Sequence, residues 1–140
     1  MYQIIIIDDV KAICNSLRRE ILKISRDNDI IFNVIDYQDP ILGLEHVLKS
    51  KVDLVISDIK MAYMSGDVLI NKIKESLPDI PIIVITGFAT KDNILSVMKA
   101  DKNIIILTKP WETQKLIDAI GKMLSLDLKH ITEDEEETKK

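Results

Sequence analysis

The sequence predicts one α/β domain in which helices cover both faces of a five-stranded parallel sheet. Five short apolar runs, rich in Ile and Val, recur along the 140 residues. They are continuous rather than alternating with polar residues, which is typical of strands buried on both faces. The segments between the runs place their apolar residues at helical spacing. Strands that alternate strictly with helices indicate a parallel sheet between two helix layers.

Each apolar run has the length of a strand and is too short for a typical helix. The expected strands span residues 4–7, 30–35, 54–56, 82–85 and 104–107. The helices are expected over residues 12–24, after Pro40, after Ser65-Gly66, after Thr90 and over residues 116–124. Pro40 suits the first turn of its helix, and Thr90 is an N-cap candidate.

The order of the strands follows from the handedness of their connections. Right-handed crossovers leave few topologies for five alternating strands and helices, and the usual one is a flavodoxin-like, doubly wound three-layer sandwich with strand order 2-1-3-4-5. Ligands of such open sheets bind at the carboxyl ends of the strands. The residues that directly follow each apolar run are therefore the candidates for function.

Composition excludes several classes of function and location. A net charge of −4 argues against nucleic acid or an anionic membrane as partner, since both attract clustered Lys and Arg. The single cysteine, Cys14, cannot form an internal disulfide, which favours a reducing cytoplasm, and it is expected to be an inert thiol. The N-terminus lacks the basic start of a signal peptide, and no apolar run approaches the roughly 18 residues of a membrane span. The domain is expected over residues 1–126, and the acidic segment 127–140 is expected to be disordered or the start of a linker.

Charged and hydroxyl side chains follow four of the five expected strands. They are Asp8 and Asp9 after the first, Asp58 after the third, Thr86 after the fourth and Lys109 after the fifth. Three carboxylates at one sheet edge repel one another unless a cation lies among them. Mg²⁺ suits them because it prefers oxygen ligands. One carboxylate oxygen could then attack phosphorus, with Lys109 and Thr86 stabilising the transferred group.

These residues stand in motifs that resemble the receiver domain of two-component response regulators, over about residues 2–125. The matching motifs are Ile7-Asp8-Asp9, residues 53–61 around Asp58, Met64-Ser65-Gly66, Ile85-Thr86-Gly87 and Thr108-Lys109-Pro110. Each motif alone is common in proteins. All five in this order, each at a strand end, make the resemblance specific.

The resemblance implies a role for each of these residues. Asp58 is expected to be phosphorylated, and Asp8, Asp9, Asp58 and the main-chain carbonyl of Lys60 are expected to hold Mg²⁺, or Mn²⁺ in its place. Thr86 and Lys109 are expected to contact the phosphoryl oxygens, with a cis Lys109–Pro110 bond. The phosphoryl donor is expected to be a sensor histidine kinase or a phosphotransfer protein, and the domain to act as a switch rather than an enzyme.

The chain departs from the family pattern within its switch region, which we expect to include Gly87, Phe88, Ile106 and Pro110. Ile106 stands where receivers commonly carry Tyr or Phe, so an aromatic switch cannot operate there. Either movement of loops and backbone alone carries the response, which we favour, or the signal is read near the phosphoryl group itself. Phe88 is expected to shield the phosphoryl group from water and to slow its hydrolysis. Ala62 replaces a common Pro, which loosens the loop after Asp58.

The output surface and three rival functions complete the expectations. By resemblance, the face of the fourth helix, fifth strand and fifth helix could form a homodimer. An Asp-nucleophile phosphohydrolase would carry Asp-x-Asp after the first strand and a cap insertion, for which the chain has no room. Flavodoxin-like flavin binding would need a Gly-rich loop where Asp8 and Asp9 stand. A degenerate receiver would act only as a binding surface, and the intact site argues against it.

Overall fold

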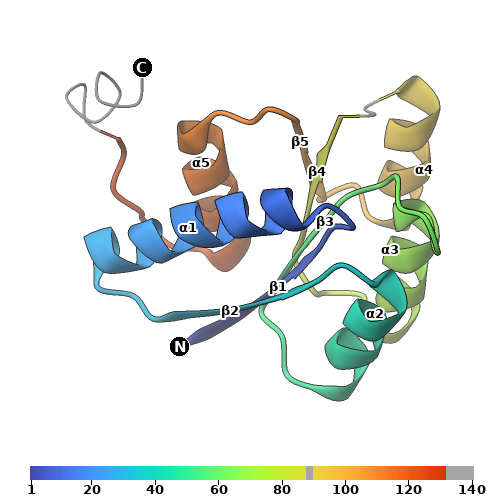
Figure 1. Ribbon diagram of the computed structural model, residues 1–140, viewed down its shortest axis with the longest axis horizontal. Coiled ribbons are helices and arrows are strands. Elements are labelled where there is room, and N and C mark those ends of the chain that lie inside the picture. The colour runs from blue at the N-terminus through green and yellow to red at the C-terminus, as the bar shows by residue number, and fades with distance from the viewer. Residues whose placement is uncertain (88–89, 132–140) are drawn as a thin grey trace.

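The computed structural model describes residues 1–87 and 90–131 of the chain, in which strands and helices alternate (Figure 1). The strands are β1 (Tyr2–Ile7), β2 (Phe32–Tyr37), β3 (Leu54–Ser57), β4 (Ile82–Thr86) and β5 (Ile105–Thr108). The helices are α1 (Lys11–Asn28), α2 (Pro40–Lys49), α3 (Gly66–Ser76), α4 (Lys91–Ala100) and α5 (Thr113–Leu124). Within this part of the chain no helix is both long and apolar enough to cross a membrane.

The five strands form one parallel sheet in the order β2-β1-β3-β4-β5. This confirms the predicted fold class and strand order. The register aligns Ile7 of β1 with Ser57 of β3, and Thr86 of β4 with Thr108 of β5. As a result, the chain leaves four neighbouring strands at nearly the same level, and the residues that follow them share one edge of the sheet.

Two apolar cores lie on opposite faces of the sheet. Helices α1 and α5 pack on one face against Ile4 and Ile6, whereas α2, α3 and α4 pack on the other against Ile5 and Ile7 (Figure 1). All four isoleucines are fully buried, which explains why the first run is continuous rather than alternating. Cys14 lies in the first core, where burial raises the pKa of its thiol, as expected of an inert cysteine.

Most element boundaries agree with the sequence prediction, and one strand is displaced. Pro40 opens α2, and the Thr90 hydroxyl caps α4 by accepting a hydrogen bond from the Asn93 N–H at 3.3 Å. The second strand begins at Phe32 rather than at residue 30. Asp29, with a left-handed φ of 52°, ends α1, and the next two residues only carry the chain to the sheet edge. Ile31 is 67% exposed there, so its apolar character misled the prediction.

The segment after α5 packs on the domain as far as the structure describes it. Leu128 is buried in the core between α1 and α5, and the Lys129 N–H donates to Asn28 Oδ1 at 2.8 Å. Residues 127–131 therefore differ from the disordered tail expected to begin at residue 127, because the buried Leu128, the partly buried Ile131 and two backbone N–H groups that donate to side chains hold them. The expectation of disorder for residues 132–140 stays a prediction, since they lie outside the described residues.

Asp36, near the end of β2, fixes this edge of the sheet to α1. Its carboxylate accepts hydrogen bonds from Lys11 Nζ at 2.9 Å, from Gln38 Nε2 at 2.7 Å and from the Arg18 guanidinium. Burial raises the pKa of Asp36, but these hydrogen bonds outweigh burial and lower that pKa to about 2. Because the folded-state pKa lies below the unfolded value, this stabilisation is present above about pH 4 and is lost as the pH falls through about 2.

Replacing Asp36 by asparagine should therefore flatten the acid limb of the stability curve. Between about pH 5 and about pH 2, we expect the free energy of unfolding of the wild type to fall by about 2 kcal/mol more than that of Asp36→Asn. Urea titrations across this range measure the difference. Asp127→Asn, which removes an exposed carboxylate, should follow the wild type. An Asp36→Asn curve parallel to the wild-type curve would contradict the assigned role.

Candidate functional site

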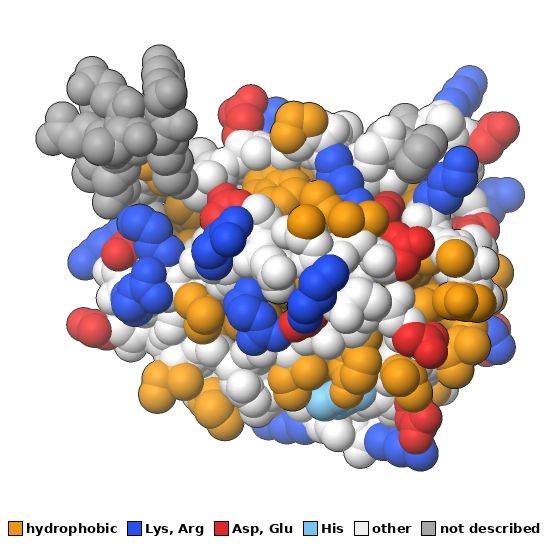
Figure 2. Space-filling view, viewed as in Figure 1, with side chains coloured by type: hydrophobic (Ala, Val, Ile, Leu, Met, Phe, Trp, Pro, Cys, Tyr) orange, Lys and Arg blue, Asp and Glu red, His pale blue; other side chains and the backbone are white. Residues whose placement is uncertain are grey.

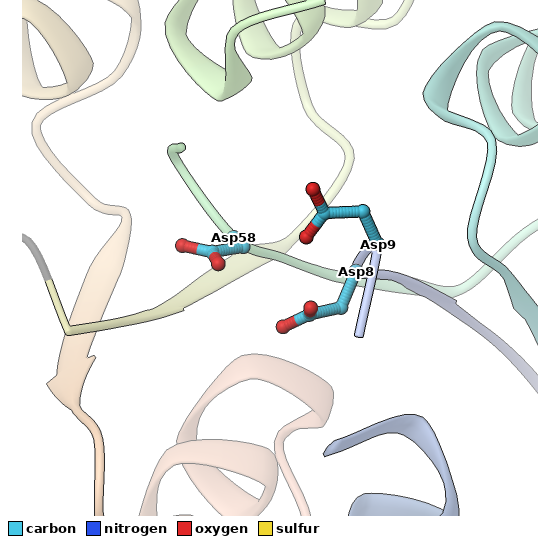
Figure 3. Close-up of side chains that lie close together, drawn as sticks. All are labelled: Asp8, Asp9 and Asp58. Carbon is cyan, nitrogen blue, oxygen red and sulfur yellow. The ribbon is translucent and has the colours of Figure 1, made fainter. Parts of the chain in front are cut away.

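The carboxylates that follow β1 and β3 meet at one edge of the sheet. One carboxylate oxygen from each of Asp8, Asp9 and Asp58 lies within 4.8 Å of the other two (Figure 3). Asp8 and Asp58 are buried, at 2% and 5% exposure, whereas Asp9 is exposed. The predicted cluster is therefore present, and its open side faces solvent through Asp9.

Lys109 supplies a positive charge to this cluster from the end of β5. Its Nζ donates to Asp8 Oδ2 at 2.7 Å and to Asp58 Oδ2 at 2.9 Å. Burial alone would lower the pKa of the ammonium, but its hydrogen bonds to the two carboxylates outweigh burial and the net shift is upward. Lys109 is therefore charged at neutral pH and bridges the two buried carboxylates.

The other oxygens of the buried carboxylates are held by backbone N–H groups. Asp58 Oδ1 accepts from the Ile59 N–H at 2.6 Å, and Asp8 Oδ1 accepts from the Val10 N–H at 2.9 Å. Val10 is the N-cap residue of α1, so neither Asp8 nor Asp9 is the N-cap of that helix. Burial raises the pKa of Asp8 despite its hydrogen bonds to Lys109 and Val10, and the neighbouring Asp58 adds to this. Hydrogen bonds thus fix the orientation of both buried carboxylates, and Lys109 alone does not neutralise their negative charge.

This donor set suits a hard divalent cation. Three carboxylates face one ammonium group, so the ionised cluster carries an excess of negative charge. All the clustered donors are oxygens, which Mg²⁺ prefers, and an exposed Asp9 leaves room for the waters that Mg²⁺ retains. Asp8, Asp9 and Asp58 are therefore the residues that could hold such an ion, and the Lys60 carbonyl stays a predicted fourth ligand.

The remaining predicted residues lie beside the cluster or outside the described residues. Thr86 ends β4 and is fully buried, and its carbonyl accepts the Lys109 N–H at 2.9 Å. The Lys109–Pro110 bond is cis, as expected. Gly87 is exposed, whereas Phe88 lies outside the described residues, so its shielding role stays a prediction. Ile106 is half-buried and lines a small pocket of about 200 Å³ with Pro110 and other residues of the β5–α5 region.

Gly66 has a steric role that the sequence did not reveal. Gly66 is the first residue of α3 and lies against the backbone of Asp58 and Ile59. Its N–H donates to the Ile59 carbonyl at 2.5 Å. A Cβ at this position would overlap the Asp58 carbonyl oxygen and lie 2.5 Å from Ile59 Cα. Both are backbone atoms, which cannot move without displacing Asp58. The close approach therefore requires glycine, although its φ is not left-handed.

Comparison with known protein families identifies this arrangement. A family model described as the response regulator receiver domain matches residues 4–121, most of the chain. The chain belongs to this receiver family. The family fits both the strand order and the strand-end residues predicted above. Receiver domains of two-component response regulators generally act as phosphorylation-dependent switches.

Curated relatives match part of this receiver domain. The sensor kinase CckA of Brucella abortus is 32% identical over 83 residues, which make up 59% of this chain and 9% of CckA. The transcriptional regulatory protein ZraR of Salmonella typhimurium is 31% identical over 83 residues, which make up 59% of this chain and 19% of ZraR. The chain thus corresponds to a small part of these relatives.

Solved structures share the fold. A CheY-like receiver domain protein from Methanospirillum hungatei has a TM-score of 0.78 at 24% identity, covering 100% of this chain and 99% of its own. The response regulator TrrA from Thermotoga maritima, solved in complex with Mg²⁺ and BeF, has a TM-score of 0.76 at 24% identity, covering 89% of this chain and 100% of its own. At this level of identity the likeness supports the fold alone.

Proposed function

We propose that this receiver takes up a phosphoryl group on Asp58 and responds with a change of conformation. The observation that carries the proposal is the bridge of Lys109 between Asp8 and Asp58, beside an exposed third carboxylate. An acidic cluster that holds a cation and a lysine that faces the acceptor are both needed to neutralise a phosphoryl group in transfer. TrrA, which shares the fold, was solved in complex with Mg²⁺ and BeF.

Within this proposal, Asp58 Oδ2 is the attacking oxygen, because Oδ1 is held by the Ile59 N–H. A bond forms from Oδ2 to phosphorus while the bond from phosphorus to the donor's leaving group breaks, and the leaving group keeps the electron pair. Lys109 Nζ then donates its hydrogen bond to a phosphoryl oxygen instead of to Asp58 Oδ2, and the Thr86 hydroxyl donates to a second phosphoryl oxygen. Mg²⁺, or Mn²⁺, when held by Asp8, Asp9 and Asp58, supplies positive charge to the transferred group.

The proposed phosphoryl donor is a histidine kinase or a phosphotransfer protein. A groove of about 860 Å³ runs beside Lys109 between α1 and the start of α5, with Ile13, Trp111 and Arg19 among its lining residues. Lys and Arg side chains gather along α1 on the face shown in Figure 2. A partner that approaches by this route would present apolar side chains with an acidic rim. A cytoplasmic location is part of the same proposal.

The proposal does not include turnover of a separate substrate. Self-phosphorylation from a donor and slow hydrolysis of the acyl phosphate are the reactions that the site would support. Phe88 would slow that hydrolysis, which Phe88→Ala tests through a faster loss of phosphate. We also propose a homodimer through α4, β5 and α5 as a route of output.

Intact-mass measurement tests the proposed function. We expect the wild type to gain the mass of one phosphoryl group when incubated with acetyl phosphate and Mg²⁺, and to gain nothing when EDTA replaces Mg²⁺. Asp58→Asn should gain nothing under either condition, because the amide is not a nucleophile of this kind. Asp53→Asn serves as the matched control, because this aspartate precedes β3 at the opposite end of the strand.

Each unexpected result has a defined meaning. An unmodified wild type would overturn the proposal and favour a degenerate receiver that only binds partners. A mass gain that persists in Asp58→Asn would place the acceptor elsewhere. Steady release of phosphate from a generic phosphomonoester, at many turnovers per chain, would favour the phosphohydrolase alternative.

A further inference from the structure

A short segment after α5 folds back across the edges of α1 and α5. We call residues 127–131 the C-terminal strap. Ser125, with a left-handed φ of 55°, turns the chain, and the Leu126 N–H donates to the Gly121 carbonyl at 2.8 Å. Leu128 is then buried at 6% exposure in the core shared by α1 and α5. A Cβ on Gly121 would lie 2.9 Å from the Leu126 carbonyl oxygen, so glycine permits this close return.

Polar contacts hold the strap to both helices. The Lys129 N–H donates to Asn28 Oδ1 at 2.8 Å, in the last turn of α1. The Ile131 N–H donates to Gln114 Oε1 at 2.9 Å, in the first turn of α5, and Gln114 Nε2 lies 2.8 Å from His130 Nδ1. One buried side chain and two backbone-to-side-chain hydrogen bonds make a weak attachment. Segments with so few contacts open at a low free-energy cost.

The last residue of the strap lies near a set of hydrogen bonds between Glu20, Trp111 and Thr113, which we call the Glu20 clasp. The clasp connects the strap to the phosphorylation site. Glu20 of α1 accepts from Trp111 Nε1 at 2.8 Å and from the Thr113 hydroxyl at 2.6 Å. Trp111 is two residues from Lys109, and both line the groove beside the site. Glu20 and Thr113 also line a small cavity together with Ile131 of the strap. Contiguous contacts therefore connect Lys109 to the strap.

We propose that the strap is the resting occupant of the α1–α5 face and that phosphorylation of Asp58 releases it. When Lys109 shifts from Asp58 to a phosphoryl oxygen, it displaces the β5–α5 loop and with it Trp111 and Thr113. Both share the Glu20 carboxylate, so the first turn of α5 moves relative to α1. Gln114 belongs to that turn and loses its alignment with the Ile131 N–H. Release exposes the apolar surface of α1 and α5 that Leu128 covers. An exposed apolar surface of this kind binds protein partners.

Hydrogen exchange and mass, measured on one sample, test this inference, which rests on the proposed function. After incubation with acetyl phosphate and Mg²⁺, we expect the amides of residues 127–131 to exchange about tenfold faster in phosphorylated chains, a coupling of ordinary size for two linked sites. Asp58→Asn should show neither the mass gain nor the faster exchange. A mass gain without faster exchange would overturn the inference and leave the proposed function intact. No mass gain would overturn both.

Two variants outside the site separate coupling from simple attachment. Thr113→Val keeps the branched shape of the side chain but removes the hydroxyl that donates to Glu20, so it should be phosphorylated normally while the exchange of the strap responds less than about twofold, because the coupling is lost. Leu128→Ala should leave the strap in fast exchange in both states, with a normal mass gain. A full response in Thr113→Val would overturn the route through the clasp, and slow strap exchange in unphosphorylated Leu128→Ala would overturn the attachment.

Discussion

Lys109→Met should lower the rate of phosphorylation by acetyl phosphate about 10²–10³-fold, the usual effect of removing one group that stabilises developing charge. The wild-type ammonium lies 2.9 Å from Asp58 Oδ2 and 2.7 Å from Asp8 Oδ2. From there it can stabilise the negative charge that develops on the phosphoryl group as Asp58 Oδ2 bonds to phosphorus. Methionine fills similar space but carries no charge. Intact-mass time courses at fixed acetyl phosphate and Mg²⁺ measure the rate.

The matched control for this prediction is Lys115→Met. Lys115 is an exposed lysine of α5, so its loss changes the net charge equally without touching the carboxylate cluster. We expect Lys115→Met to be phosphorylated within about twofold of the wild-type rate, because charges exposed to solvent are screened. If Lys109→Met and Lys115→Met had the same rate, Lys109 would have no part in the transfer.

Gly66→Ala should lower the free energy of unfolding by about 3 kcal/mol, the upper end of the usual cost of overpacking. The added methyl group would overlap the Asp58 carbonyl oxygen and lie 2.5 Å from Ile59 Cα. Neither backbone atom can yield as a flexible side chain would. The strain must displace either α3 or the loop that presents Asp58, so the phosphorylation rate should fall as well. Urea unfolding and the mass assay measure the two effects.

Gly87→Ala is the control for the steric argument. No described atom lies within 4 Å of a Cβ built on Gly87, and its φ is not left-handed. We therefore expect its free energy of unfolding to stay within about 0.5 kcal/mol of the wild-type value. Equal losses in the two variants would show that the close approach at Gly66 is not the cause.

The fold could be predicted from the sequence because local pattern and topology agree. Continuous Ile-rich runs marked the buried strands, and helical spacing marked the segments between them. Once alternation was clear, the handedness of crossovers left the observed strand order. The displaced second strand shows the limit of this reasoning. Ile30 and Ile31 are as apolar as strand residues, but α1 ends in a left-handed turn at Asp29 and the strand begins only at Phe32.

The site was predictable to the extent that its residues follow strands. The carboxyl ends of parallel strands converge, which brought Asp8, Asp58 and Lys109 together despite separations of 51 and 101 residues along the chain. The Glu20 clasp does not follow a strand. It joins Glu20 on the surface of α1 to Trp111 and Thr113, which follow it by 91 and 93 positions in the chain. No sequence periodicity marks such pairs. The strap was missed because two isolated apolar residues, Leu128 and Ile131, give no periodic pattern.

The structure of the protein crystallised with Mg²⁺ and beryllofluoride tests the central claim most directly. We predict beryllium bonded to a carboxylate oxygen of Asp58, and a metal ion held by Asp8, Asp9, Asp58 and the Lys60 carbonyl. Lys109 Nζ should have turned from Asp58 Oδ2 to a fluoride atom. A structure in which Lys109 still bridges Asp8 and Asp58, with neither beryllium nor metal bound among them, would contradict the account.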